Sequence, residues 1–411
     1  MNKKIALRTL LGLVATAGIV TTTGCGGRGA YTREGTSLAK EKMNIIKSAT
    51  EWEMARQAFF AGDLEKALKK VDLSISINPG IAKSHVLRGR VMLEKGEIGH
   101  GVRSLETALA IEPDNVDANY YMGIASERLV QLEDAFTYYD KASQLDEYSD
   151  QYAVAAAEML MDLKRYDEAK TYLETTASHD HSAGIRQTLG HLARLQGDLP
   201  AAVNEFKSAQ LLAPDDLGIL EDLTSAQYDS GNYADAAYGF ATLLTRKETS
   251  DRRDLKSNYA KCLIKLDRPM EARKLYKELT QGNQGASNIE AWIGLGNVSY
   301  TVGDFTTVRQ AATRVVALAP SRKDGYLLWA VLHRNKGNIE ASIRSLNDAI
   351  ERDPADPLLH TMIALGLLEL NKTTQARAAL SKAMALDPDN KSAATVMSMI
   401  NQKVTSVPTS D

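Results

Sequence analysis

Residues 82–115, AKSHVLRGRVMLEKGEIGHGVRSLETALAIEPDN, decide the fold of this chain. Apolar residues recur at helical spacing as far as Leu93, Gly96 interrupts the pattern, and Leu105 and Leu109 resume it. This alternation predicts two short antiparallel helices joined by a tight turn, that is, a helical hairpin.

Small residues and one proline are expected to shape this hairpin. Gly89 and Gly101 fall where a side chain would hold the two helices apart. Pro113 is expected to end the second helix before the next one begins. Because neither helix can bury its apolar face alone, the hairpin needs neighbours of the same kind.

The pattern returns about every thirty-four residues, and ten units can be aligned between residues 48 and 388. The unit ends with a proline at Pro79, Pro113, Pro214, Pro320, Pro354 and Pro388. The register slips by about two residues near 245–254 and again near 280–288. Residues 391–402 are expected to form one more helix, which covers the exposed face of the last unit.

This period resembles the tetratricopeptide repeat, with small residues at offsets eight and twenty, an aromatic residue or leucine at twenty-four, and proline at thirty-two. The resemblance implies an all-α fold, a tetratricopeptide α-solenoid. It would be a right-handed superhelix of about ten helical hairpins plus a C-terminal capping helix. The first helices of the hairpins would line a concave groove that binds peptides or partner helices.

The domain organisation follows from these boundaries. We expect a lipoprotein-type signal peptide at 1–24 and a flexible tether with the start of the first helix at 25–47, where Gly26–Ser37 is glycine-rich and polar. Repeat units one to six then occupy 48–250, units seven to ten occupy 251–388, and a capping helix with a frayed tail occupies 389–411.

The amino terminus has the features of an export signal: a basic start, a short apolar run and small residues before Cys25. The approach to Cys25 resembles a bacterial lipoprotein signal, which implies that Cys25 becomes the acylated first residue. Thr22 departs from that pattern, because an aliphatic residue is usual there. The alternative is an ordinary secretory signal cleaved near Gly26 or Ala30.

The resemblance implies anchoring in the cell envelope through N-terminal acyl chains, and Gly26 after the cysteine favours the outer membrane, with the repeats facing the periplasm. The net charge of the whole chain is −3, and loss of 1–24 removes three basic residues and no acidic one, which leaves −6. Nucleic-acid binding needs a basic footprint, so no nucleic-acid partner is predicted.

The sequence carries none of the usual catalytic motifs. The chain has no His-Glu-x-x-His pair, phosphate-binding loop or Gly-x-Ser-x-Gly elbow, so we predict no enzyme activity, no cofactor and no metal site. His179 and His181 lie one residue apart, but a metal would need further ligands, and a solvated turn is the favoured interpretation. Cys262 is expected to be a small buried apolar residue.

The groove of this repeat family is lined by offsets two, five, nine, twelve and thirteen of each first helix. In the hairpin quoted above these offsets are Lys83, Val86, Arg90, Leu93 and Glu94. Across the repeats the candidate partner-groove residues are Arg56, Arg90, Tyr120, Glu127, Arg128, Glu158, Gln187, His191, Arg194, Tyr228, Lys261, Asn297, Tyr300 and Arg334. Arginine and tyrosine are typical anchors of protein interfaces.

The sequence therefore favours a non-catalytic scaffold that binds a protein or peptide partner and resembles the envelope lipoproteins of pilus assembly, secretion and envelope biogenesis. An alternative is a polysaccharide-binding scaffold for exopolysaccharide export, in which Tyr120, Tyr228 and Tyr300 stack on sugar rings.

Overall fold

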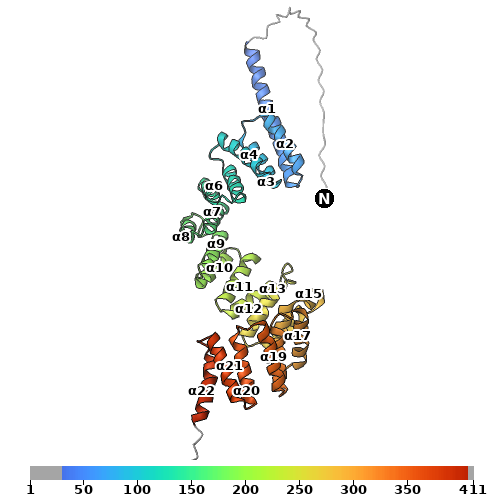
Figure 1. The fold of residues 1–411 in the computed structure, drawn as a ribbon. Helices are drawn as coiled ribbons and strands as arrows, with labels where there is room; N and C mark the ends of the chain where they lie inside the picture. Colours follow the sequence, from blue (N-terminus) through green and yellow to red (C-terminus); the bar gives the residue numbers. More distant parts are fainter. Residues whose placement is uncertain (1–29, 406–411) are drawn as a thin grey trace, which may run out of the picture. The chain divides into compact units, whose positions relative to one another are not determined.

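The computed structural model describes residues 30–405, and within them it contains 22 helices and no strand (Figure 1). The predicted signal peptide at 1–24 and Cys25 lie outside the described residues, as do residues 406–411. None of the described helices is long and apolar enough to cross a membrane.

The chain divides into two compact units at Ala142/Ser143, inside one helix. The N-terminal unit contains α1 (Ala30–Phe60), α2 (Leu64–Ile77), α3 (Ala82–Glu94), α4 (Ile98–Ile111), α5 (Val116–Arg128) and most of α6 (Leu132–Leu145). These are three consecutive hairpins, as the repeat pattern predicts.

The C-terminal unit continues the hairpins and adds two single helices. Its helices are α7 (Asp150–Asp162), α8 (Tyr166–Thr175), α9 (Ala183–Leu195), α10 (Leu199–Leu212), α11 (Leu217–Asp229), α12 (Tyr233–Thr245), α13 (Arg253–Lys265), α14 (Pro269–Leu279), α15 (Gly282–Ala286), α16 (Ile289–Thr301), α17 (Phe305–Leu318), α18 (Asp324–Asn335), α19 (Ile339–Arg352), α20 (Pro357–Glu369), α21 (Thr373–Leu386) and α22 (Lys391–Thr405). The lengthened connections fall where the register slips, before α13 and at α15.

Glycines allow the two helices of a hairpin to touch at their crossing. A Cβ atom placed on Gly89 would lie 2.6 Å from Leu105 Cγ, and one on Gly101 would lie 3.2 Å from the carbonyl oxygen of Gly89. In the next hairpin a glycine packs in the same way against an aromatic ring, because a Cβ on Gly123 would lie 2.5 Å from the ring of Tyr139. The predicted role of the crossing glycines is confirmed.

Side-chain caps define where many helices begin. Asp63 accepts a hydrogen bond from the Lys66 amide at the start of α2, and Asn115 accepts one from the Ala118 amide at the start of α5. Each cap satisfies an amide that has no partner inside the helix. Ser182, Asp198, Asp216, Asn288, Asp304, Asn338 and Asp356 cap their helices in the same way.

The turn inside each hairpin needs one residue with positive φ. Glycine fills this position in several hairpins, for example Gly96 at φ 78°, but Val130 occupies it at φ 60°. A β-branched residue is strained there, because its Cβ approaches the following carbonyl oxygen. The side chain of Val130 is 78% exposed and contributes little packing in return.

Val130→Gly is therefore expected to raise the free energy of unfolding by about 1 kcal/mol, since relief of strain exceeds the entropy cost of glycine. The midpoint of urea unfolding would measure it. Leu129→Gly is the matched control: Leu129 is also exposed but has φ −88°, so that substitution should lower the midpoint. A lower midpoint for Val130→Gly would contradict the strain argument.

The expected C-terminal capping helix is present as α22. Its residues Ala393 and Ile400 are buried against the last hairpin and share a core cluster with Leu380 and Ala383 of α21. The cap therefore covers the apolar face that a following repeat would cover.

The tether expected through Ser37 differs in the structure, where α1 is already helical from Ala30. Helix growth explains the difference, because each residue added to an existing helix costs far less than starting a new one. The glycine-rich composition of this segment is thus overridden by the helix that follows it. Residues 26–29 lie outside the described residues.

Candidate functional site

The first helices of the N-terminal unit, α1, α3 and α5, share a surface that we call the N-terminal groove face. Its central residue is Arg90 on α3. The Arg90 guanidinium carbon lies 4.9 Å from the ring centroid of Phe59 on α1 and 4.6 Å from that of Tyr121 on α5. Arg90 therefore joins three successive hairpins through two cation–π contacts.

Arg90 has no counter-ion within the part of the chain that the structure describes. Its Nε atom is buried and has no hydrogen-bond partner there, although the side chain as a whole is only half-buried. Leaving a buried polar group unpaired costs free energy. Because Nε is buried, an external carboxylate would have to be met by the Nη atoms of this guanidinium.

Further aromatic and basic side chains on α1 and at the start of α3 extend the N-terminal groove face. Lys83 Nζ lies 4.4 Å from the ring centroid of Trp52, and the indole Nε1 donates to the carbonyl oxygen of Lys83 at 3.1 Å. Arg56 forms an ion pair with Glu53 at 2.6 Å, and its guanidinium carbon lies 5.8 Å from the Phe60 ring. Phe60 is 67% exposed, so this part of the face offers apolar area to a partner.

Three predicted residues on α5 are occupied by internal contacts. Arg128 Nη1 donates to the carbonyl oxygen of Leu93 at 2.6 Å, which ties α5 to α3. Glu127 accepts a hydrogen bond of 2.7 Å from the Tyr139 hydroxyl, and the Tyr120 ring lies 5.6 Å from the Tyr139 ring. These side chains therefore hold neighbouring helices together, and their polar groups are already engaged within the protein.

Two residues of α3 that were predicted to line the groove lie instead in the core. Val86 and Leu93 are 5% and 2% exposed and pack with Ala118 and Met122 of α5. The prediction that both face the groove is wrong, because the next first helix packs directly over these two positions. Lys83 and Glu94 are exposed, as expected.

In the C-terminal unit, predicted groove residues on α9 bond to acids on α11. Gln187 Nε2 donates to Asp222 at 2.6 Å, His191 Nε2 lies 3.1 Å from the same carboxylate, and Arg194 bonds Asp229 at 3.0 Å. Burial raises the pKa of Asp222, but the hydrogen bonds from His191 and Gln187 outweigh it and lower the pKa below its usual value. Here the basic side chains already have their acceptors.

The remaining predicted residues lie on the other first helices of the C-terminal unit and on α11. Arg334 on α18 pairs with Glu369 on α20, and Lys261 on α13 donates to Asn258 at 3.3 Å. Burial raises the pKa of the Tyr228 phenol on α11. The others are Glu158 on α7 and Asn297 and Tyr300 on α16, all exposed.

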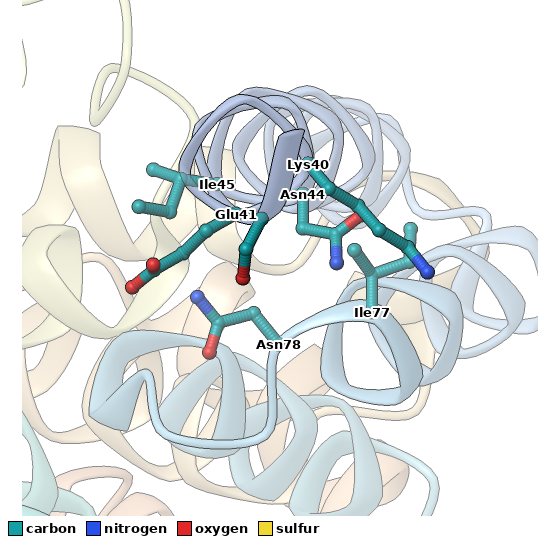
Figure 2. Close-up of a pocket in the computed structure, with 7 residues that line it drawn as sticks. Lys40, Glu41, Asn44, Ile45, Ile77 and Asn78 are labelled. Carbon is teal, nitrogen blue, oxygen red and sulfur yellow. The ribbon is translucent and has the colours of Figure 1, made fainter. Parts of the chain in front are cut away.

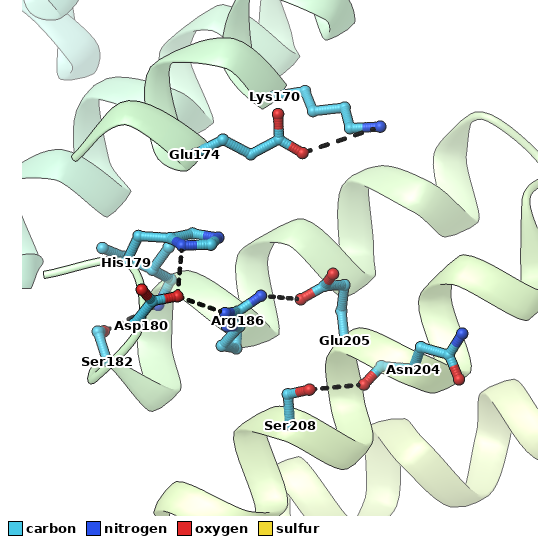
Figure 3. A network of polar contacts seen from close by, with 10 residues as sticks. Lys170, Glu174, His179, Asp180, Ser182, Arg186, Asn204, Glu205 and Ser208 are labelled. Atoms are coloured by element: carbon cyan, nitrogen blue, oxygen red, sulfur yellow. Dashed lines mark hydrogen bonds and ion pairs between the residues drawn. The ribbon is translucent and has the colours of Figure 1, made fainter. Parts of the chain in front are cut away.

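The turn with His179 and His181 carries a polar network and no metal-binding cluster among the described residues (Figure 3). His179 Nδ1 lies 3.0 Å from Asp180, whose carboxylate also accepts from Arg186 at 2.9 Å. Arg186 in turn pairs with Glu205 at 3.1 Å. The network fastens this turn, which lacks the usual closing proline, to α9 and α10.

Cys262 is fully buried, as expected, and burial raises the pKa of its thiol to about 11. Relative to the ordinary value of 9.0, this rise leaves about 100-fold less thiolate at neutral pH.

Folded protein is therefore expected to react with a maleimide at least about 100-fold more slowly at Cys262 than urea-unfolded protein. Mass spectrometry of the Cys262 peptide measures the rate, and similar rates in both states would contradict the assignment.

Sequence reasoning missed the partners of Arg90 and of the α9 side chains. Phe59, Tyr121 and Asp222 were not assigned to the groove, yet they determine which groove residues are free. Tyr121 and Asp222 both stand at offset six of their first helices. That offset, which reaches back to the preceding first helix, is the signal that would have found them.

Comparisons with known proteins agree on the repeat. Residues 86–150 and 327–391 match the sequence model of the tetratricopeptide repeat family. A TPR repeat-containing protein of Bacillus subtilis, YpiA, is 22% identical over 303 residues, which are 72% of this chain and 69% of that protein.

Solved structures with similar folds include a tetratricopeptide repeat protein from Parabacteroides merdae, at 15% identity and a TM-score of 0.43, covering 62% of this chain and 99% of that one. The type IV pilus biogenesis factor PilW matches with 19% identity and a TM-score of 0.44, covering 50% of this chain and 95% of that one. The fold of this chain is an all-α array of helical hairpins, and two stretches of it match tetratricopeptide repeats. Such repeats are generally non-catalytic scaffolds for protein–protein interaction.

Proposed function

We propose that this protein is an exported scaffold, anchored at a bacterial envelope membrane through acyl chains on Cys25, which holds a protein partner on its N-terminal groove face. The observation that carries the proposal is Arg90, a guanidinium held between Phe59 and Tyr121 with no counter-ion among the described residues. The partner segment would place a carboxylate on Arg90 and an apolar side chain near Phe60.

The contrast between the two units supports this choice of face. In the C-terminal unit, Arg194 and Arg334 already pair with acids of the next first helix. A partner there would have to displace an existing ion pair, whereas a carboxylate at Arg90 forms a new one. Affinity at an interface depends on such unsatisfied, prearranged groups more than on area.

A place in pilus assembly, secretion or envelope biogenesis is the finer form of this proposal, and it rests on the lipoprotein-like sequence at Cys25.

The alternative, a polysaccharide-binding scaffold, requires tyrosine rings whose faces are accessible to a sugar ring. The Tyr120 and Tyr228 rings are half-buried and lie 5.3 Å and 5.6 Å from the rings of Tyr121 and Tyr233. Tyr300, at 43% exposure, has the most open ring of the three. These observations favour the protein partner.

Affinity purification of the tagged full-length protein from membranes tests the proposal. We expect one partner to be enriched with the wild type and reduced with Arg90→Glu, while circular dichroism shows the same helicity. Equal recovery of that partner by the variant would exclude the N-terminal groove face as its binding site.

Membrane anchoring is tested separately by Cys25→Ser. The wild type is expected to fractionate with membranes and the variant to lose that association. Membrane association of the variant as strong as that of the wild type would refute acylation of Cys25 as the anchor.

A further inference from the structure

The first helix continues well beyond the hairpin to which it belongs. Helix α1 has 31 residues, whereas its partner α2 has 14. Near the end of α2, Ser74 Oγ donates to the carbonyl oxygen of Ser48 at 2.8 Å, and Ser48 is buried. Before Ser48, every residue from Gly35 to Lys47 is exposed except the half-buried Asn44. We call residues 35–47 the α1 extension.

Only one side of the α1 extension is near α2. An open cleft of about 420 Å³ separates them and is lined mostly by polar groups, among them Lys40, Glu41, Asn44 and Asn78 (Figure 2). This side therefore faces water or a polar neighbour. Of the large apolar residues of the extension, Ile45 borders this cleft, whereas Leu38, Met43 and Ile46 are not part of its lining.

Four large apolar side chains are exposed on the extension: Leu38 by 51%, Met43 by 57%, Ile45 by 48% and Ile46 by 67%. At about 100° per residue they fall within an arc of about 160° on one side of the helix. Isolated exposed apolar residues need no explanation, but a continuous stripe on an otherwise uncovered helix indicates a binding surface.

The charge of the extension indicates which kind of partner its apolar stripe binds. Lys40, Lys42 and Lys47 are exposed and Glu41 is its one acidic residue, so this segment is basic although the whole chain is acidic. Lys42 lies within the apolar stripe, where its long stem can lie along apolar groups while the ammonium reaches phosphates. An apolar stripe with lysines is typical of helices that lie in the headgroup region of an anionic bilayer.

The distance to Cys25 adds a geometric constraint, and this step rests on the proposed acyl anchor. Five residue steps separate Cys25 from Ala30, where α1 begins, and they span at most roughly 18 Å. An acylated Cys25 therefore keeps the first turn of α1 within that distance of the membrane surface.

We propose that the α1 extension is a membrane-surface helix, with Leu38, Met43 and Ile46 inserted among anionic lipid headgroups and Ile45 at the border between this stripe and the cleft. Acyl chains on Cys25 would supply affinity, and the helix would set the orientation of the repeats. The N-terminal groove face, which begins on the same helix at Trp52 and Arg56, would then be held at a defined height above the bilayer.

Environment-sensitive fluorescent labels on introduced cysteines test this. Met43→Cys lies on the apolar stripe, and Glu41→Cys, two residues away, lies on the side of the cleft. Cys262 does not compete for the label, because it is buried. Each full-length protein is reconstituted into vesicles of phosphatidylethanolamine and phosphatidylglycerol. We expect several-fold brighter, blue-shifted emission from the Met43 position and little change from the Glu41 position.

The controls separate this inference from the anchor. If the protein co-floats with vesicles but both labels remain in water, the membrane-surface helix is refuted and the anchor stands. The same labels on Cys25→Ser protein test the helix without the anchor: a contrast that weakens with salt or with phosphatidylcholine vesicles supports it, and no contrast refutes it. A contrast that needs no vesicles and grows with protein concentration would assign the stripe to a second copy of the chain.

Discussion

Replacing Gly89 by leucine is expected to lower the free energy of unfolding by about 3 kcal/mol relative to replacing Gly99 by leucine. Both glycines belong to one hairpin, and both lie within its helices. The two positions differ in the room available to an added side chain. A Cβ atom on Gly89 would lie 2.6 Å from Leu105, whereas the atom nearest to a Cβ on Gly99 would be the end of Arg103 at 4.0 Å. The difference between the variants therefore isolates the helix crossing.

Leu105 cannot move aside cheaply, because it is fully buried in the core cluster that includes Leu93 and Ala108. The crossing would have to open, and hairpins on either side would lose contacts, since each repeat depends on its neighbours. Urea unfolding followed by circular dichroism measures the effect, and amide exchange in α3 and α4 locates it. Equal unfolding midpoints for the two variants would mean that the glycine is not needed for close packing.

Arg90→Gln is expected to weaken binding of the partner recovered by affinity purification about 100-fold, because a carboxylate brought to this site would lose its counter-ion. The matched variant is Arg194→Gln. Arg194 also lies at a groove offset of a first helix, α9, but it already bonds Asp229, so its loss should change affinity by roughly twofold or less. Titration calorimetry with the purified partner measures both.

A loss of packing must be distinguished from a loss of charge, because Arg90 also contacts Phe59 and Tyr121. Arg90→Lys keeps the charge but not the planar fork, and we expect an intermediate loss of about tenfold. Thermal unfolding of each variant shows whether the hairpins stay together. If Arg90→Gln and Arg194→Gln weaken binding equally, the N-terminal groove face is not the specific site.

The hairpins could be predicted from the sequence because their determinants are local. Helical spacing around Leu93 and Leu105, the break at Gly96 and the proline at Pro113 all act within one unit, and ten repetitions reinforce the pattern. The capping helix followed from the same reasoning, since an end repeat must be covered. The beginning of α1 was missed, because helix extension from a stable neighbour overrides glycine-rich composition.

Which groove residues are free was decided by tertiary structure alone. Arg90 and Arg194 both lie at groove offsets of first helices, nine and twelve, but Arg194 meets an acid thirty-five residues later, and Arg90 meets two aromatic rings. Val86 fits the groove offsets, yet it is buried because α5 packs over it. The sequence by itself determined the repeat and its packing glycines, because these depend on neighbours along the chain. The state of each groove side chain depends on residues of adjacent hairpins, so only the stacked structure could decide it.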